Sequence, residues 1–317
     1  LERGSHNLAL NAASPPAGDA AAKLAGEREA TDKAFAATLA ALPASSAKTM
    51  ADWQRKLAEA RAPVTAALSQ PLAQRPAGTA KTWTAANFAV GDAVIAEGMA
   101  LLQQLNRLDG AVGDFVTLAH AAASLRNTTG QRNTTLLNVI AAGQPMTPEQ
   151  WERHARFTGQ VDQLWETIKS QTAALDAGDD IAATLKAVET AVFGDVMTII
   201  RRMEVASRAQ EPYPASAADF RQTTVGKFST IAGLRDSFVE RAIAVCDEEL
   251  SAVNGRLALA LGTLAVLVAM LAAVTVAFNR RVVAALMRTA ATIARLADND
   301  LDIDIPDRDR ADEIGRI

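Results

Sequence analysis

Apolar residues recur every three or four positions along most of the chain, and no stretch alternates apolar and polar residues as a strand would. A spacing of three and four places side chains on one face of an α-helix, so the pattern predicts an all-α protein. Segments rich in Pro, Gly, Ser and Asp interrupt the pattern at residues 14–19, 42–49, 70–82, 109–114, 141–150, 175–180 and 209–219. These breaks delimit eight predicted helices ahead of residue 257.

Short motifs in the first four predicted helices reappear in the same order in the next four. The matched pairs are Gly4-x-x-Asn7 with Gly130-x-x-Asn133, Asp32-x-x-Phe35 with Asp162-x-x-Trp165, and Trp83 with Phe220. The offset between partners grows from 126 to 130 to 137 residues along the chain, as loop insertions would produce. The ordered set predicts two tandem, duplicated four-helix bundles, residues 1–112 and 113–256.

Residues 257–278 contain no charged side chain over 22 positions. At about 1.5 Å of rise per residue, this stretch spans about 33 Å as a helix, which matches a bilayer core. Arginines follow it, whereas Asp247, Glu248 and Glu249 precede it. Because basic residues favour the cytoplasmic side, we expect a transmembrane helix with residues 1–256 outside and 279–317 in the cytoplasm. A domain that starts and ends at one membrane face needs a second span, which we expect ahead of Leu1.

Composition and charge narrow the class of protein further. The net charge of −4 argues against nucleic acid as a partner. Cys246 is the single cysteine, so the chain forms no internal disulfide, and we expect this residue to be buried on a helix. The three histidines, His6, His120 and His154, match no metal-binding motif. We therefore expect no catalytic site, metal or cofactor in this portion of the protein.

Polar residues crowd two helices that the repeat matches to each other. The candidate ligand-binding residues are Arg126, Arg132 and Asn133 on one helix, and Arg3 and Asn7 on its counterpart. Guanidinium forks and amides at these positions would hold a small anionic ligand between helices. The alternative interpretation is a solvated helix face or a polar layer between helices.

The chain ends with an amphipathic segment of recognisable pattern. Leu286, Ile293 and Leu296 are spaced seven and three apart, as in a coiled coil. A connector, "DLDIDIP", and the sequence "ADEIGRI" follow. Residues 279–317 resemble a HAMP domain, whose second helix opens with Asp-Glu-Ile-Gly and is here almost wholly absent. The resemblance implies a signal-relay role for Leu286, Ile293, Leu296, Leu301, Pro306, Asp312, Glu313 and Gly315.

Two positions depart from the HAMP pattern: Ala285 replaces the usual proline and Asn299 the usual glycine. HAMP domains form parallel four-helix coiled coils in homodimers and relay motions of membrane helices to an output domain. The resemblance therefore implies a homodimer and an output domain beyond this incomplete unit.

The outer region resembles the periplasmic helical sensor modules of bacterial chemoreceptors. It is also similar to the nitrate- and nitrite-sensing family, an all-helical double bundle that uses arginines for its anion. These resemblances imply a methyl-accepting chemotaxis receptor of the bacterial inner membrane, with a periplasmic ligand, lipid contacts and a downstream kinase complex. Two alternatives remain: the sensor portion of a diguanylate cyclase or histidine kinase, and a ligand-free structural membrane anchor.

Overall fold

A computed structural model describes residues 2–105, 110–175, 177–298, 300, 302–304 and 310–311. These residues form helices and connecting segments without a β-strand, so the predicted all-α class is confirmed. The α-helices are α1 (Glu2–Asn11), α2 (Asp19–Ala41), α3 (Ala44–Leu68), α4 (Thr79–Leu105), α5 (Gly110–Ala142), α6 (Pro148–Ala173), α7 (Gly178–Val188), α8 (Met197–Ala209), α9 (Ala217–Lys227), α10 (Ser229–Phe278) and α11 (Ala284–Ala297). A 3-10 helix covers Leu72–Gln74, and π-helical segments cover Glu189–Val196 and Asn279–Val283. The chain divides into two compact units, Leu1–Cys246 and Asp247–Ile317.

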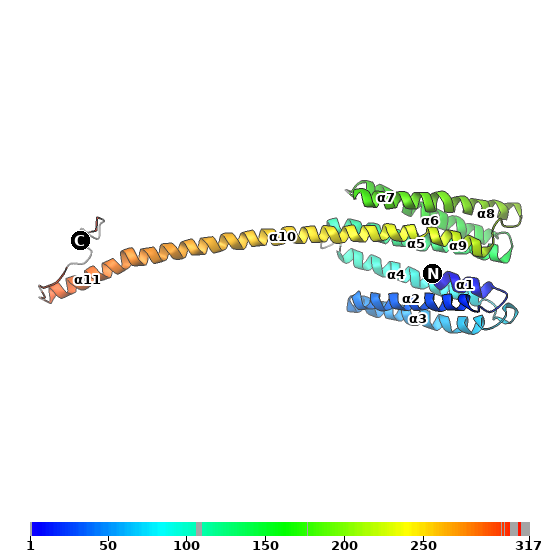
Figure 1. Cartoon of the computed structure of the whole chain (residues 1–317), viewed down its shortest axis with the longest axis horizontal. Coiled ribbons are helices and arrows are strands. Elements are labelled where there is room, and N and C mark those ends of the chain that lie inside the picture. Colours follow the sequence, from blue (N-terminus) through cyan, green and yellow to red (C-terminus); the bar gives the residue numbers. More distant parts are fainter. Residues whose placement is uncertain are drawn as a thin grey trace. The chain divides into compact units, whose positions relative to one another are not determined.

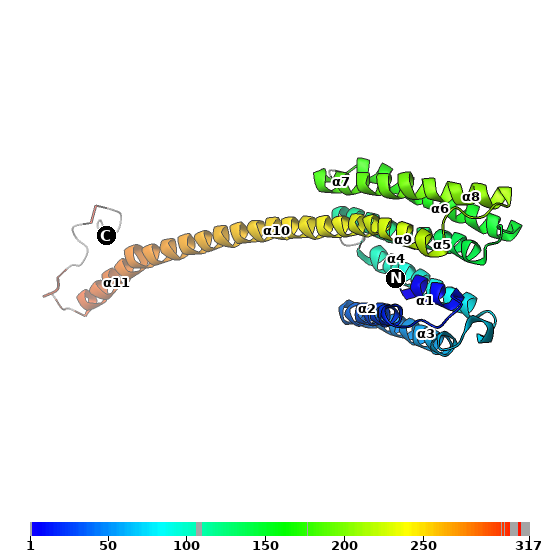
Figure 2. The same cartoon turned by 45° about the vertical axis from the view of Figure 1, so that its right-hand side comes forward.

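Helices α1 to α4 lie side by side within the first unit (Figures 1 and 2). Apolar residues that recur at helical spacing bury the faces that meet there. Trp83 on α4 is 1% exposed and is central to this core. The buried members are Leu10, Leu24, Phe35, Leu57, Val64, Ala67, Leu68, Trp83 and Val90.

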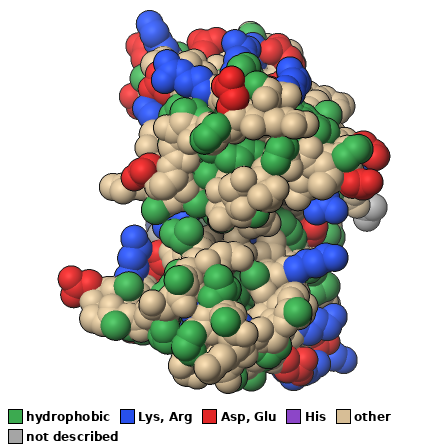
Figure 3. Space-filling model, turned by 90° about the vertical axis from the view of Figure 1, so that its right-hand side faces the viewer, with side chains coloured by type: hydrophobic (Ala, Val, Ile, Leu, Met, Phe, Trp, Pro, Cys, Tyr) green, Lys and Arg blue, Asp and Glu red, His purple; other side chains and the backbone are tan. Residues whose placement is uncertain are grey.

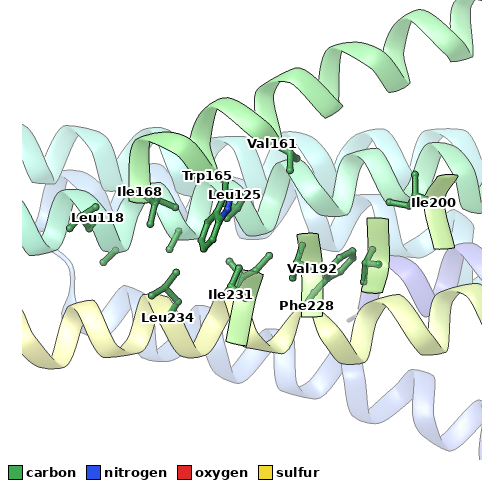
Figure 4. Packing of buried hydrophobic residues seen from close by; sticks show 14 of the residues in the cluster. Leu118, Leu125, Val161, Trp165, Ile168, Val192, Ile200, Phe228, Ile231 and Leu234 are labelled. Atoms are coloured by element: carbon green, nitrogen blue, oxygen red, sulfur yellow. The ribbon is translucent and has the colours of Figure 1, made fainter. Parts of the chain in front are cut away.

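A second core in the same unit joins α5, α6, the helices from α7 to α8, α9 and the start of α10. Trp165 on α6 stacks on Phe193 at 4.7 Å between ring centroids. Figure 4 shows Trp165 and Ile168 directed toward Ile231 and Leu234 of α10. The aromatic residues Trp165, Phe220 and Phe238 are each buried in this core. Helices α4 and α5, and helices α1 and α9, connect this group of helices to the first.

Two helices begin with side-chain caps. The backbone N–H of Gln150 donates to Thr147 Oγ1 at 3.3 Å, and the backbone N–H of Thr147 donates to Gln150 Oε1 at 2.8 Å. Ser216 Oγ accepts from the backbone N–H of Asp219 at 3.1 Å and begins α9. Each cap satisfies N–H groups that the first helical turn leaves open, which is worth about 1 kcal/mol.

Some details of the predicted pattern are wrong. The break expected over 42–49 is confined to Leu42 and Pro43, because the Ser- and Ala-rich residues after Pro43 join α3. The last predicted helix is interrupted at Phe228, between α9 and α10. Cys246, expected to be buried, is exposed. Ala242 and Val245 occupy the side of α10 that packs on the core, and Cys246 occupies the next position around the helix.

Two stretches of helix are long and apolar enough to cross a membrane, α4 and the stretch that covers residues 217–297. In α4, Trp83, Thr84, Val90 and Leu102 are buried against neighbouring helices. In the second stretch, the most apolar window has no buried side chain. The predicted span 257–278 lies within that stretch, and its large apolar side chains, including Leu259 and Leu271, are exposed.

Candidate anion-binding site

A cavity of about 390 Å³ lies in the first unit among residues of α1, α2, α4, α5 and α9. Arginines predominate among the charged residues that line it. On the helix ends shown in Figure 3, acidic, basic and hydrophobic side chains are interspersed. The lining residues that bear on its chemistry are Arg3, Arg126, Asn127, Asn133, Gly130 and Arg221.

Helix α5 presents one continuous face to the cavity. Arg126, Gly130, Asn133 and Leu137 follow one another at intervals of four, three and four residues, so they share one side of the helix. Arg132 lies six residues after Arg126, which places it about 240° around the helix. The same helix therefore directs Arg126 into the cavity and Arg132 away from it.

Gly130 brings two guanidinium groups together. A Cβ at this position would lie 2.6 Å from Nη2 of Arg3 and 3.3 Å from Nη1 of Arg126. The missing side chain therefore allows both cations to rest directly on the backbone of α5. A glycine in a helix interior costs about 1 kcal/mol relative to alanine, so the residue is retained here against its helix propensity.

Each of these two arginines lies over an aromatic ring. The guanidinium carbon of Arg3 is 4.2 Å from the ring centroid of Phe88 on α4. The guanidinium carbon of Arg126 is 5.2 Å from the ring centroid of Phe228. The negative faces of the rings attract the cations and orient their planes. The N–H edges of the guanidinium groups remain available for another acceptor.

The electrostatics of the cavity favour a negative ligand. Burial and, to a lesser extent, the positive charge of Arg126 lower the pKa of Arg3 to about 10, although Asp92 acts in the opposite direction. Burial also lowers the pKa of Arg126. Arg3 remains protonated at neutral pH, and two like charges therefore meet in a place with little water. Neither guanidinium donates a hydrogen bond to any described protein acceptor.

The nearest carboxylates are engaged elsewhere. Glu2 is 3% exposed and accepts from Arg61 at 2.8 and 2.7 Å, a bidentate pair. Asp92 accepts from the side-chain amides of Asn127 and Gln131, each at 2.9 Å. Glu2 is thus paired with Arg61, whereas the amide partners of Asp92 are neutral, so Asp92 keeps its charge and partly offsets that of Arg3.

Arg221 on α9 is a third cation of the cavity, and the sequence analysis missed it. Its Nη2 donates to Ser5 Oγ, and it lies 3.9 Å from Glu27. Burial lowers its pKa, and the charge of Glu27 partly offsets that effect. A Cβ at Gly4 would lie 3.1 Å from Nε of Arg221. The Gly4 motif was visible in the sequence, but nothing in the sequence indicated which arginine would cross it.

The five predicted ligand residues divide into two groups. Arg3, Arg126 and Asn133 line the cavity, whereas Asn7 and Arg132 do not. Asn7 donates to Asn138 Oδ1 at 2.9 Å and its Oδ1 lies 3.2 Å from Thr84 Oγ1, so it connects α1 to α5 and α4.

Arg132 is fully buried within the second group of helices. Its Nη1 donates to Met197 Sδ at 3.2 Å, while Nε and Nη2 have no described partner. Burial lowers its pKa to about 10, against the attraction of Asp162 and Glu204.

The predicted relay residues can be placed only in part. Leu286, Ile293 and Leu296 lie on α11, with exposed fractions of 45%, 57% and 51%. Leu301, Pro306, Asp312, Glu313 and Gly315 lie outside the described residues. The three leucine and isoleucine side chains therefore form an apolar stripe that the described part of the chain leaves uncovered.

Comparisons with known proteins found no matching family model, no matching curated protein and no matching solved structure. Within the described ranges, no three His, Cys, Asp or Glu side chains are placed to hold a metal ion.

Proposed function

We propose that this chain is the sensory portion of a bacterial inner-membrane receptor that binds a small anion in the periplasm. The observation that carries the proposal is the pair of guanidinium groups of Arg3 and Arg126, which meet on Gly130 in a cavity and have no described acceptor. Two half-buried cations without an ion-pair partner are costly to hold together, because burial removes part of their hydration and their charges repel. An anion that accepts from both guanidinium groups removes this cost.

The chemistry of the lining favours a small, planar oxyanion. A guanidinium group is a flat fork that matches two oxygens held in one plane. The side-chain amides of Asn127 and Asn133 also line the cavity. Asn127 donates to Asp92 at 2.9 Å and Asn133 to Thr224 Oγ1 at 2.8 Å, which leaves each amide one further N–H. Nitrate, nitrite and short carboxylates combine this geometry with a size below the cavity volume of about 390 Å³.

The cavity also adjoins the helix that would carry the signal. Phe228 lies under Arg126 and separates α9 from α10. An anion that repositions Arg126 alters the contact with Phe228, and with it the packing of α10. In this proposal residues 257–278 cross the membrane, and α11 is the first helix of a HAMP unit in a homodimer. The output is chemotaxis signalling through a kinase complex, and the ligand biases it only by binding one packing state more tightly.

Calorimetric titration of the full chain in lipid nanodiscs tests this function. The ligands are sodium nitrate, nitrite, acetate and sulfate in a buffer low in chloride, and the variants are Arg3→Ala and Arg126→Ala. Arg55→Ala is the matched control, because Arg55 is an exposed α3 residue that pairs with Asp52 at 3.0 Å. We expect saturable binding of a planar oxyanion that either cavity variant weakens and Arg55→Ala leaves unchanged. Absence of binding, or equal binding by all variants, would contradict the proposal.

A further inference from the structure

A second cavity, of about 380 Å³, lies among α1, the segment that joins α1 to α2, α2 itself and α9. Its apolar wall includes Leu8, Pro15, Pro16 and Leu24. The charged residues of its described lining are Lys23 and Arg221, and both are cations. Sites for small molecules typically measure about 300–1,000 Å³ and combine apolar walls with a few polar groups. The second cavity has this size and this composition.

Arg221 lines the second cavity and the anion cavity alike. A Cβ at Gly4, in the lining of the anion cavity, would lie 3.1 Å from its Nε. Its Nη2 donates to Oγ of Ser5, in the lining of the second cavity. The carboxylate of Glu27 is 3.9 Å away, which is too far for a hydrogen bond. The described residues therefore leave this guanidinium group only partly paired.

The segment between α1 and α2, which forms one wall of the second cavity, is held in place by Arg75. Its Nη1 donates to the backbone carbonyls of Ala9, Leu10 and Ala12 at 2.8, 2.6 and 2.9 Å. Its Nη2 donates to the carbonyl of Ser14 at 3.3 Å. The two prolines that follow Ser14 have φ angles fixed by their rings. A wall fixed in this way loses little conformational freedom when a ligand binds, which favours affinity.

We propose that the second cavity binds a small carboxylate with an apolar tail, whose carboxylate pairs with Arg221 and Lys23. The tail would lie against the apolar wall, where its burial removes hydrocarbon from water. An alcohol of the same shape would leave the two cations without a counter-charge, and an inorganic anion would leave the apolar wall in water. The ligand class is therefore different from that of the anion cavity, and the site does not depend on the proposed function.

Occupancy of the second cavity should also weaken anion binding, a consequence that rests on the proposed function. Because Arg221 lines both cavities, two bound anions would compete for one guanidinium group and repel each other across it. Coupling between two sites is reciprocal, so each ligand lowers the affinity for the other by the same factor. The carboxylate would thus act as an antagonist of the anion.

Calorimetric titration of the full chain in lipid nanodiscs with butanoate, pentanoate and hexanoate tests the second site, with empty nanodiscs as the baseline. We expect the affinity to rise about fourfold with each added CH₂ group, and 1-hexanol to bind more weakly than hexanoate. Ala20 lines the cavity and is exposed, so Ala20→Phe fills the cavity without disturbing the core. This variant should lose at least about tenfold in hexanoate affinity. Ala21→Phe, at the next exposed position of α2 and outside the lining, should lose none.

Three results would overturn the second site: no saturable binding of hexanoate, an affinity independent of chain length, or equal binding by Ala20→Phe and the unmodified chain. Arg126→Met separates the two cavities, since it should weaken nitrate binding and leave hexanoate binding unchanged. A parallel loss of both ligands would place hexanoate in the anion cavity and refute the proposal.

Nitrate titrations at increasing hexanoate concentrations measure the coupling. The nitrate affinity should fall several-fold and then level off once the second cavity is saturated. A loss that continues without limit indicates competition for one site, and no loss at all contradicts the coupling. If hexanoate binds and nitrate does not, the proposed function and the coupling fail while the second site stands. If nitrate binds and hexanoate does not, the second site fails and the proposed function stands.

Discussion

The matched glycines Gly4 and Gly130 each lie under a guanidinium group from another helix. These two contacts, which we call the Gly4 crossing and the Gly130 crossing, differ in chemistry. At Gly4 the guanidinium belongs to Arg221, which donates to Ser5 and lies near Glu27. At Gly130 two guanidinium groups meet, and neither has a described acceptor. Arg221 therefore has a protein acceptor and a nearby acid, although its Nε and Glu27 Oε2 are buried without a hydrogen-bond partner. Arg3 and Arg126 have no acceptor among the described residues, and in the proposed function an anion takes that place.

A glycine beneath a guanidinium group therefore does not by itself determine what that cation binds. In both cases the absence of a Cβ brings a cation onto a helix backbone, and the neighbouring acid decides what the cation does. Glu27 is available to Arg221, whereas Glu2 near Arg3 is held by Arg61. The proposed ligand-binding crossing is thus the one whose adjacent acid, Glu2, is paired with another arginine.

We expect the largest loss of anion affinity when one of the two arginines at Gly130 is removed. Arg126→Met retains an apolar stem over Phe228 and removes one of the two charges that face the cavity. Removing one partner of a buried charge pair typically costs about 2–5 kcal/mol of binding, or at least roughly 30-fold in affinity. Calorimetric titration with the anion that binds the unmodified chain measures the change, with Arg55→Met as the control. Unchanged affinity would show that the anion binds elsewhere.

Loss of Arg221 at the Gly4 crossing should lower the stability of the folded protein. Arg221→Ala leaves Glu27 without its cation, and Oε2 of Glu27 is already buried without a hydrogen-bond partner. An unsatisfied buried charged group costs about 1–3 kcal/mol or more, so we expect a lower midpoint of thermal unfolding. The double variant Glu27→Gln/Arg221→Ala should recover part of the loss. If Arg3→Ala destabilises the ligand-free protein as much, the distinction between the crossings is wrong.

Alanine in place of Gly130 tests whether the missing side chain is needed for anion binding. In Gly130→Ala the new methyl group meets the mobile ends of Arg3 and Arg126, so the side chains move while the helix remains. We expect at least about a tenfold loss of anion affinity, which corresponds to about 1.4 kcal/mol. Gly159→Ala on α6 is the control, since nothing lies within 4 Å of its Cβ and alanine favours the helix. Equal affinities of the two variants would remove Gly130 from the site.

The smallest expected effect concerns His6, which the repeat matches to Arg132. His6 is 1% exposed, its ring lies 5.4 Å from that of Trp83, and burial lowers its pKa. The unfolded chain therefore binds a proton at higher pH than the folded protein does. Stability should fall as the pH drops through about 6.5, the ordinary pKa of histidine, until the lowered folded pKa is reached.

Thermal unfolding between pH 8 and pH 5.5 measures the contribution of His6. His6→Gln should show a flatter dependence on pH than the unmodified chain, because the substituted side chain does not titrate. The remaining slope comes from other groups. Parallel curves for the two proteins would show that His6 does not contribute.

Much of the helical pattern was predictable because it depends on local sequence. The breaks at Pro- and Gly-rich segments and the caps at Thr147 and Ser216 follow from short-range chemistry. The candidate site was predictable in part, since three of the five proposed ligand residues line the cavity. The prediction that Arg132 lines the site was wrong, because the number of polar residues on a helix does not show which side of the helix each one occupies.

Other features depend on packing between distant segments. Arg221 comes to Gly4 from 217 positions along the chain, and no local pattern encodes that contact. The exposure of Cys246 depends on where α10 stops contacting the core, which is likewise a tertiary property. The assignment of the predicted relay residues to a HAMP unit stays a prediction.

The most direct test of the central claim, that an anion completes the Gly130 crossing, is thermal unfolding of the unmodified chain and Arg126→Met, each with and without the bound anion. Without anion, Arg126→Met should be the more stable protein, since it lacks an unpaired buried charge and replacing such a charge by an apolar side chain is often stabilising. With saturating anion the order should reverse, because only the unmodified chain gains binding free energy. If the unmodified chain is more stable under both conditions by the same margin, Arg126 is an ordinary structural residue and the account is contradicted.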